Sequence, residues 1–235
     1  MIYFLSYGDN KYTNSKKRIK IEAERMKVFD KILIKEPKDI SNDIPELTKK
    51  VLSMQRGGGY WIWKPIIIKE QLDKMNENDI LIYVDSGCSL NINGINRLKE
   101  YFNMVMDENK PLVRFKMDIS ENKYTTTAIF DHFKVNNNKS YTDSGQYMAT
   151  AIIMRKCDLL DKIIKYWYIT AIKYPLLFTD HFNNYNKKDE FIDNRHDQSI
   201  FSIITKLFYK NVNTIDDKTY PFNKDEPIYA SRIRG

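Results

Sequence analysis

The sequence predicts an α/β fold in which helices flank a doubly wound, mainly parallel sheet. Three observations lead to this class. Short apolar runs alternate with longer segments whose apolar residues recur at helical spacing. The run Ile80–Val84 is apolar throughout, as expected for a buried strand. It ends on Asp85 and Gly87, and this places a carboxylate at the carboxyl edge of a sheet, where open α/β sheets bind ligands.

The strands are predicted from apolar runs that turn residues bound, as Gly8 and Asp9 bound the first run. Helices are predicted from helical spacing, with Pro45 and Pro65 in the first turns of two of them. The predicted strands are 2–6, 28–34, 80–84, 112–117, 147–154 and a last short one from Val212. The predicted helices are 15–27, 44–54, 65–74, 93–106, 124–133, 158–172 and 198–208, with 179–195 irregular.

Length and composition favour one domain. The chain has 235 residues, 42% of them hydrophobic and 13% aromatic, and no linker rich in Pro, Gly or Ser interrupts it. The net charge of +7 suits a polyanionic ligand such as a diphosphate, a nucleic acid or an anionic membrane. A lysine-rich solvated surface explains the same charge.

Cysteine usage and the amino terminus indicate a cytoplasmic protein. Cys88 and Cys157 are too few for a disulfide framework and are interpreted as reduced thiols. Residues 1–6 resemble a first strand rather than a signal peptide, and no run approaches eighteen apolar residues. The expected location is the cytoplasm, with peripheral membrane contact or a host cytoplasm, if the chain is viral, left open.

Asp85 is the first candidate for chemistry. A carboxylate at a strand end can hold a divalent cation, which in turn neutralises a diphosphate leaving group. An aspartate that caps the turn through Ser86 is the structural alternative. Gly87 allows a ligand to approach the backbone closely.

The segment Gly57–Pro65 is the second candidate. Three successive glycines predict a flexible loop with free amides that can cradle phosphate. Trp61 and Trp63 can stack on a base or a sugar, and Lys64 can meet phosphate as a point charge. Alternatively, the tryptophans are half-buried core residues and Lys64 is solvated.

The segment 194–199 supplies the third candidate. His196, Asp197 and Gln198 offer a metal or phosphate ligand, a carboxylate and an amide for sugar hydroxyls. An aspartate at a helix N-terminus is also favoured by the helix dipole alone.

Several other residues carry weaker signals. The turn ending at Gln146 is an acceptor loop or an ordinary turn, and His132 and His181 are interpreted as structural or surface residues. Arg232 and Arg234 form a phosphate clamp or a frayed basic tail. The histidines and cysteines lack zinc-site spacing.

Through these motifs the chain resembles GT-A-fold glycosyltransferases, specifically small bacterial and large-virus enzymes related to the families with an Asp-x-Asp sugar-binding region. The resemblance runs from about residue 2 to 206. The matching stretches are Phe4–Asp9, Gly59–Pro65, Tyr83–Cys88 and Arg195–Ser199, with Gln146–Met154 similar to the strand that carries acceptor-side residues.

The resemblance implies one domain over 1–235, with a nucleotide-binding half at 1–110 and an acceptor-side half at 111–235. It implies a UDP-linked sugar donor, Mn²⁺ or Mg²⁺, and a glycan, lipid-linked or protein acceptor. Asp85 and His196 are the implied metal ligands, and Asp197 and Asp85 the implied catalytic residues. Gly87 stands where the motif has its second aspartate. The implied donor-binding residues are Ser6, Tyr7, Gly8, Trp61, Lys64, Asp85, Ser86, Gly87, Gln146 and Gln198.

The predicted function is metal-assisted transfer of a sugar to an acceptor hydroxyl, with Lys64 offsetting charge on the diphosphate. Two alternatives stay open at this point. A nucleic-acid-binding protein is suggested by the charge and the aromatic residues, although acidic residues are interleaved and no binding module appears. An inactive nucleotide-sugar-binding relative is suggested by Gly87.

Overall fold

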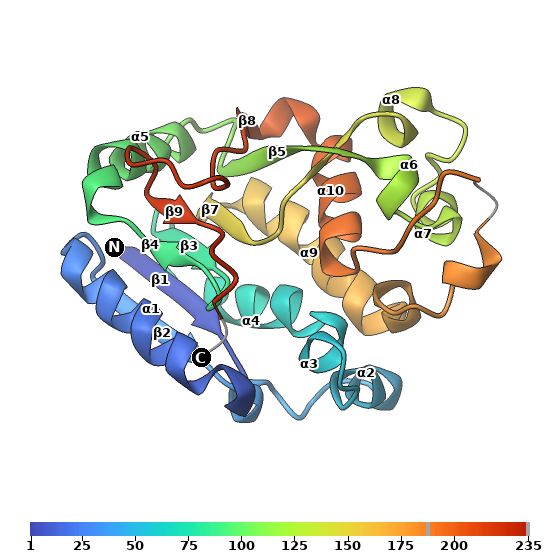
Figure 1. Cartoon of the computed structure of the whole chain (residues 1–235), viewed down its shortest axis with the longest axis horizontal. Coiled ribbons are helices and arrows are strands. Elements are labelled where there is room, and N and C mark those ends of the chain that lie inside the picture. The colour runs from blue at the N-terminus through green and yellow to red at the C-terminus, as the bar shows by residue number, and fades with distance from the viewer. Residues whose placement is uncertain (187–188, 234–235) are drawn as a thin grey trace.

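The computed structural model describes residues 1–186 and 189–233. A seven-stranded sheet runs through this described part of the protein, and Figure 1 shows how its strands are arranged. Its strand order is β2-β1-β3-β7-β5-β6, and β8 pairs with β5. The strands are β1 (Ile2–Tyr7), β2 (Lys31–Lys35), β3 (Ile80–Val84), β5 (Leu112–Ser120), β6 (Gly145–Tyr147), β7 (Ala151–Arg155) and β8 (Asn213–Asp216).

Strand direction makes the sheet mostly parallel. The strands β1, β2, β3, β5 and β8 point one way, because β1 pairs in parallel with β2 and β3, and β8 with β5. Strands β6 and β7 run the opposite way. The predicted α/β class with a mainly parallel, helix-flanked sheet is confirmed. The division into halves at residue 110 stays a prediction.

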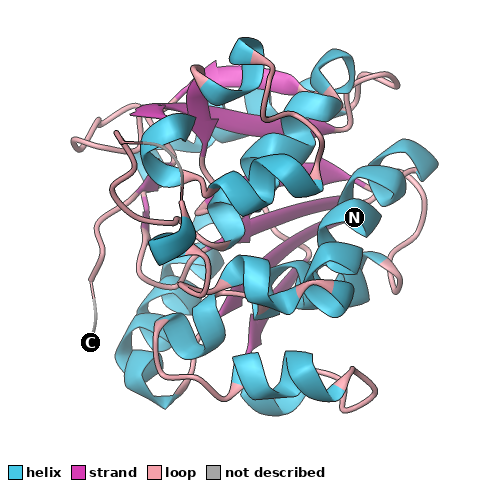
Figure 2. Cartoon of the chain, turned by 90° about the vertical axis from the view of Figure 1, so that its right-hand side faces the viewer, coloured by secondary structure: helices cyan, strands magenta, loops and turns pink. Residues whose placement is uncertain are grey.

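Helices cover both faces of the sheet (Figure 2). Alternate residues of β1 and β3 enter opposite cores: Leu5 and Tyr83 enter one, and Phe4 and Ile82 the other. The first core packs against α4, α9 and α10, and the second against α1 and α5. The longer helices are α1 (Thr13–Met26), α2 (Glu46–Leu52), α4 (Trp63–Leu72), α5 (Ile95–Val105), α9 (Asp158–Lys173) and α10 (Asp197–Leu207). The short ones are α3 (Gly57–Tyr60), α6 (Glu121–Tyr124), α7 (Thr127–His132) and α8 (Lys139–Thr142).

Element ends differ from the predicted ones where local contacts intervene. The strand expected at 28–34 starts at Lys31, because Val28 and Phe29 pack into the second core instead. The strand expected at 147–154 divides into β6 and β7. The helix expected at 124–133 begins at Thr127, because the hydroxyl of Thr126 caps it by accepting from the Ile129 amide.

A small second sheet joins two distant segments and was not predicted. Strand β4 (Ser89–Leu90) follows the Asp85 turn, and β9 (Ile228–Tyr229) lies in the carboxyl-terminal tail. The tail runs down the front of the molecule in Figure 1. Gly94 permits this path, since a Cβ there would lie 2.4 Å from the Pro227 nitrogen. Within the described residues, no helix is both long and apolar enough to cross a membrane.

We expect Gly94→Ala to destabilise the fold by about 1–3 kcal/mol, because the added methyl must displace the Glu226–Pro227 backbone. The measurement is the urea unfolding midpoint. Gly87→Ala is the matched control, since its Cβ would meet its nearest neighbour at an ordinary 3.8 Å. Equal midpoints for the two variants would show that the tail gives way without cost.

Candidate active site

A left-handed turn of five residues connects α2 to α4. Gly57, Gly58 and Gly59 have φ of 59°, 59° and 97°, and Tyr60 and Trp61 follow at 53° and 56°. Glycine is required at position 59, where a Cβ would stand 2.6 Å from the Leu52 Cα. The predicted loop with free amides is wrong for residues 58–61. Their four amides donate to the carbonyls of Gln55, Arg56, Arg56 and Gly57, so this turn has a fixed shape.

The turn sends its two tryptophans to different places. Trp63 is buried and stacks on Tyr7 with ring centroids 3.9 Å apart, while its Nε1 donates to the Gly57 carbonyl. Trp61 is half-buried and stacks on His196 at 5.2 Å. The structure therefore brings Trp63, rather than Trp61, to the end of β1.

Lys64 begins the buried face of α4 and is only 2% exposed. Its Nζ lies 2.7 Å from Asp197 Oδ2 and 3.2 Å from Asp85 Oδ1, and it donates to the Ala149 carbonyl at 3.1 Å. One hydrogen bond to a carbonyl and two ion pairs to carboxylates therefore surround this ammonium. Burial lowers the pKa of Lys64, but the attraction of Asp197 and Asp85 outweighs it, so the net shift is upward and the lysine stays charged.

Asp85 follows β3 and keeps a partly exposed side chain. Its Oδ1 accepts from the Tyr83 hydroxyl at 2.5 Å as well as facing Lys64. Burial, together with the charge of Asp85, raises the pKa of Tyr83, so this phenol remains a donor. Tyr83 was missed by sequence reasoning. The signal was its position two residues before Asp85, on the same face of the strand.

Asp197 is the first residue of α10, and its side chain is 6% exposed. Burial raises its pKa to about 6, although the Lys64 charge opposes the shift. The structure thus brings Lys64, Asp85 and Asp197 together from three segments far apart in sequence.

His196 directs its ring elsewhere. Its Nδ1 lies 2.9 Å from the Phe178 carbonyl, and its Nε2 is 3.9 Å from Asp180 Oδ1. A carbonyl only accepts, so Nδ1 carries the proton. Burial, and secondarily the charge of Arg56, lowers the pKa of His196, which favours the neutral ring. None of its contacts among the described residues reaches Asp85.

Donors from two other elements fix the Asp85–Cys88 turn. Arg18 of α1 donates to the carbonyls of Ser86 and Cys88 at 3.0 and 2.8 Å. From the tail, the Ser231 hydroxyl and the Ile233 amide both donate to the Gly87 carbonyl at 3.0 Å. Ser86 and Gly87 are therefore held in place through their backbone carbonyls.

Arg232 crosses the same turn. Its Cα would lie 3.8 Å from a Cβ built on Gly87. Burial lowers the pKa of Arg195, and the charge of Arg232 adds to that shift. Arg234 lies outside the described residues.

A cavity of about 430 Å³ opens at the carboxyl ends of β1 and β2. Tyr7, Asp9 and Gly58 line it together with residues before, within and after α2. Ser6, the residue before Tyr7, is fully buried, and its hydroxyl has no partner among the described residues. Gly8 continues the sheet edge by donating its amide to the Lys35 carbonyl.

Gln146 and Gln198 meet at the start of α10. Gln198 Nε2 donates to Gln146 Oε1 at 2.8 Å. Gln146 is fully buried, so it lies behind Gln198, which is 8% exposed.

The described residues contain no cluster of three or more His, Cys, Asp or Glu side chains able to hold a metal ion. Asp85 Oδ2 has no partner among them. A single carboxylate oxygen suits a cation that takes most of its other ligands from substrate phosphates and water. Asp85 fits this role, and the ring orientation of His196 does not.

The remaining candidates have structural surroundings. Burial lowers the pKa of His132, whose ring contacts Phe133 and Tyr174. His181 packs against Phe182. Both cysteines are free: Cys88 is buried, and the Cys157 sulfur caps α9 by accepting from the Leu160 amide.

No family model matches the chain, and no curated protein matches it. Solved structures are similar to it at low identity. A glycosyltransferase involved in the glycosylation of the major capsid of PBCV-1 is 12% identical over 97% of this chain and 91% of that chain, with a TM-score of 0.51. The WbbM bifunctional glycosyltransferase is 12% identical over 91% of this chain, with a TM-score of 0.50, and the match spans 38% of WbbM. These likenesses confirm the predicted GT-A-like fold.

The pKa of Asp197 predicts a specific pH dependence of stability. Between pH 4 and pH 6 the native state keeps a proton on Asp197 that the unfolded chain releases, so stability falls as the pH rises through this window. Relative to Asp197→Asn, the wild type should lose on the order of 3 kcal/mol of unfolding free energy across it. Urea titrations of both proteins at several pH values measure the difference, and a flat difference would show that the pKa of Asp197 is not raised in the folded protein.

Proposed function

We propose that the chain is a glycosyltransferase that moves a sugar from a nucleotide diphosphate sugar, UDP-linked, to an acceptor hydroxyl. The observation that carries this proposal is the triad Lys64–Asp85–Asp197. It lies at the carboxyl edge of a sheet with the GT-A-like fold, which is where such sheets bind ligands.

The nucleoside would occupy the cavity at the ends of β1 and β2. Tyr7 offers an aromatic wall whose orientation Trp63 fixes by stacking, and Asp9 offers a carboxylate. Tyr7 links the cavity to the triad. It lines the cavity and stacks on Trp63, which directly precedes Lys64. A donor spanning from the cavity to Asp85 would place its diphosphate between them.

Asp85 would hold Mn²⁺ or Mg²⁺ together with oxygens of the diphosphate. Such a cation offsets the negative charge that develops on the leaving diphosphate. The protein's own contribution is orientation: Tyr83 and Lys64 both hold Asp85 Oδ1 and leave Oδ2 for the ligand side. Because its buried ammonium is paired with both carboxylates, Lys64 acts on them rather than on phosphate.

Asp197 would face the transferred sugar or the acceptor hydroxyl. Its pKa of about 6 leaves it ionised at neutral pH, while remaining close enough to neutrality for proton exchange with a hydroxyl. In an inverting reaction it would serve as general base, and in a retaining reaction it would position the sugar.

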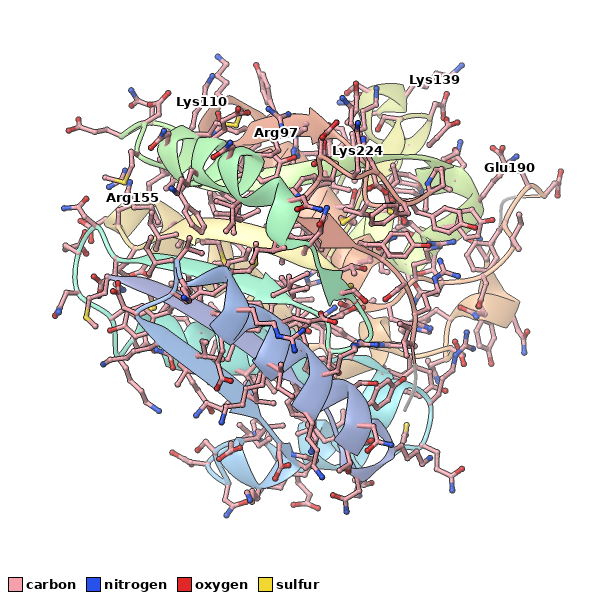
Figure 3. All side chains as sticks on the ribbon, turned by 60° about the vertical axis from the view of Figure 1, so that its left-hand side comes forward. Arg97, Lys110, Lys139, Arg155, Glu190 and Lys224 are labelled. Atoms are coloured by element: carbon pink, nitrogen blue, oxygen red, sulfur yellow. The ribbon has the colours of Figure 1, made fainter. Side chains whose placement is uncertain are left out.

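The basic surface does not favour nucleic acid as the ligand. Figure 3 shows Lys110, Lys224 and Lys139 along the upper side of that view, each on a different segment of the chain. Other basic side chains are paired with carboxylates, as Lys16 is with Glu36 and Arg56 with Asp180, and such pairing interrupts a basic track along a phosphate backbone.

The donor class is tested by thermal unfolding with a panel of nucleotide sugars, with and without Mn²⁺. We expect one UDP-sugar to raise the melting temperature, and Mn²⁺ to enlarge the shift, because a ligand that binds only the folded state stabilises it by mass action. Stabilisation without turnover toward any acceptor or water would indicate an inactive binding relative. No shift at millimolar donor would contradict the proposal.

We expect Asp85→Asn to reduce transfer at least about 100-fold, because the isosteric amide removes the charge that organises the diphosphate. Folding should be preserved, since Asp197 still pairs with Lys64 and the amide oxygen can still accept from Tyr83. The readouts are turnover with the identified donor and the melting temperature. Asp73→Asn, at an exposed carboxylate after α4, is the control, and full turnover of Asp85→Asn would remove Asp85 from the mechanism.

A further inference from the structure

A chain of buried hydrogen bonds leads from the second half of the sheet to α10, and it begins at Glu121. This carboxylate is fully buried and pairs with Lys206 Nζ at 2.6 Å. It also accepts from the hydroxyls of Ser202 and Thr125. An ionised carboxylate only accepts, so the hydroxyl hydrogen of Thr125 is committed to Glu121.

The hydrogen bond from Thr125 to Glu121 fixes the orientation of the Gln146 side-chain amide. Its Nε2 lies 2.9 Å from Thr125 Oγ1, 3.2 Å from the Tyr124 carbonyl and 3.3 Å from Ser199 Oγ. Each of these atoms can only accept from Gln146: Thr125 has given its hydrogen to Glu121, the carbonyl has none, and Ser199 donates its own to the Tyr124 carbonyl at 2.6 Å. The amide must therefore direct its NH₂ toward them and its Oε1 toward α10.

The orientation passes to Gln198, whose Nε2 donates to Gln146 Oε1 at 2.8 Å. A reversed Gln198 amide would set two carbonyl oxygens against each other in a buried place, which is unfavourable. Gln198 Oε1 then accepts no hydrogen bond from the described residues. It belongs to the first turn of α10, one residue after Asp197.

We infer that Glu121, Thr125 and Gln146 form a positioning relay that holds the Gln198 carbonyl oxygen toward the bound sugar. Gln198 Oε1 is then a hydrogen-bond acceptor in the site, and it accepts from a hydroxyl group of the transferred sugar. Gln146, which the sequence suggested as a direct ligand, acts through Gln198 instead. This role rests on the proposed function.

The test compares the dissociation constants of the donor sugar nucleotide and of its free nucleoside diphosphate, measured by calorimetry. We expect Gln198→Leu and Gln146→Leu each to weaken the sugar nucleotide roughly 3- to 10-fold, the size of one lost hydrogen bond, and to leave the nucleoside diphosphate within about twofold. The double variant should be no weaker than Gln198→Leu, because Gln146 acts only through Gln198.

Two further variants keep the test decisive. Gln71→Leu, at another buried glutamine in α4, is the matched control and should change neither constant. If Gln146→Leu does not fold, Thr125→Val loosens the relay more mildly and should weaken only the sugar nucleotide, by about twofold.

Three outcomes would overturn the inference. Equal weakening of both ligands would make Gln146 a purely structural residue, and unchanged affinity in Gln198→Leu would remove the sugar contact. Additive losses in the double variant would break the link between the two glutamines. A wild type that binds neither ligand would instead refute the proposed function, and this role with it.

Discussion

The ammonium of Lys64 is the interaction on which the site depends. An unpaired buried charge is strongly destabilising, and removing one partner of a buried ion pair typically costs about 3–5 kcal/mol. Lys64 avoids this cost because it pairs with Asp85 and Asp197 and donates to the Ala149 carbonyl. Those acceptors lie after β3, at the start of α10 and before β7. The lysine therefore fixes the relative positions of three segments that local structure alone would leave independent.

The left-handed turn before α4 follows from the same requirement. Lys64 reaches the sheet edge because the chain reverses within five residues of positive φ, and such backbone persists only where neighbours hold it. Stacking of Trp63 on Tyr7 and of Trp61 on His196 holds the far side of the turn. Arg56 holds its near side through ion pairs of 2.7 Å to Asp180 and Asp193. His196 is itself left-handed at φ 55°, so strain is shared by both segments that meet there.

Sequence reasoning succeeded where periodicity decides the structure. The run Ile80–Val84 is a strand with those bounds, and Asp85 stands at the sheet edge as expected. It failed where distant contacts decide. The tail strand β9 pairs with β4 across almost 140 positions, and two-residue strands have no measurable period. For Gln146 the sequence indicated a polar group near the site, but only Thr125 and Tyr124 show that its amide faces inward.

The two carboxylates of the triad differ in a way that suggests a division of labour. Asp85 is partly exposed at the turn, whereas Asp197 is buried with its pKa raised to about 6. Two carboxyl groups whose environments differ in this way commonly have different chemical roles.

One ammonium against two carboxylates leaves the triad with a net negative charge at neutral pH, so a diphosphate approaching Asp85 would be repelled. A divalent cation bound to Asp85 would make the local charge positive at this exposed carboxylate, but not at Asp197. Asp197 would stay shielded by Lys64 and free to meet an uncharged hydroxyl, and this charge balance is the physical reason for placing the diphosphate at Asp85 and the sugar at Asp197.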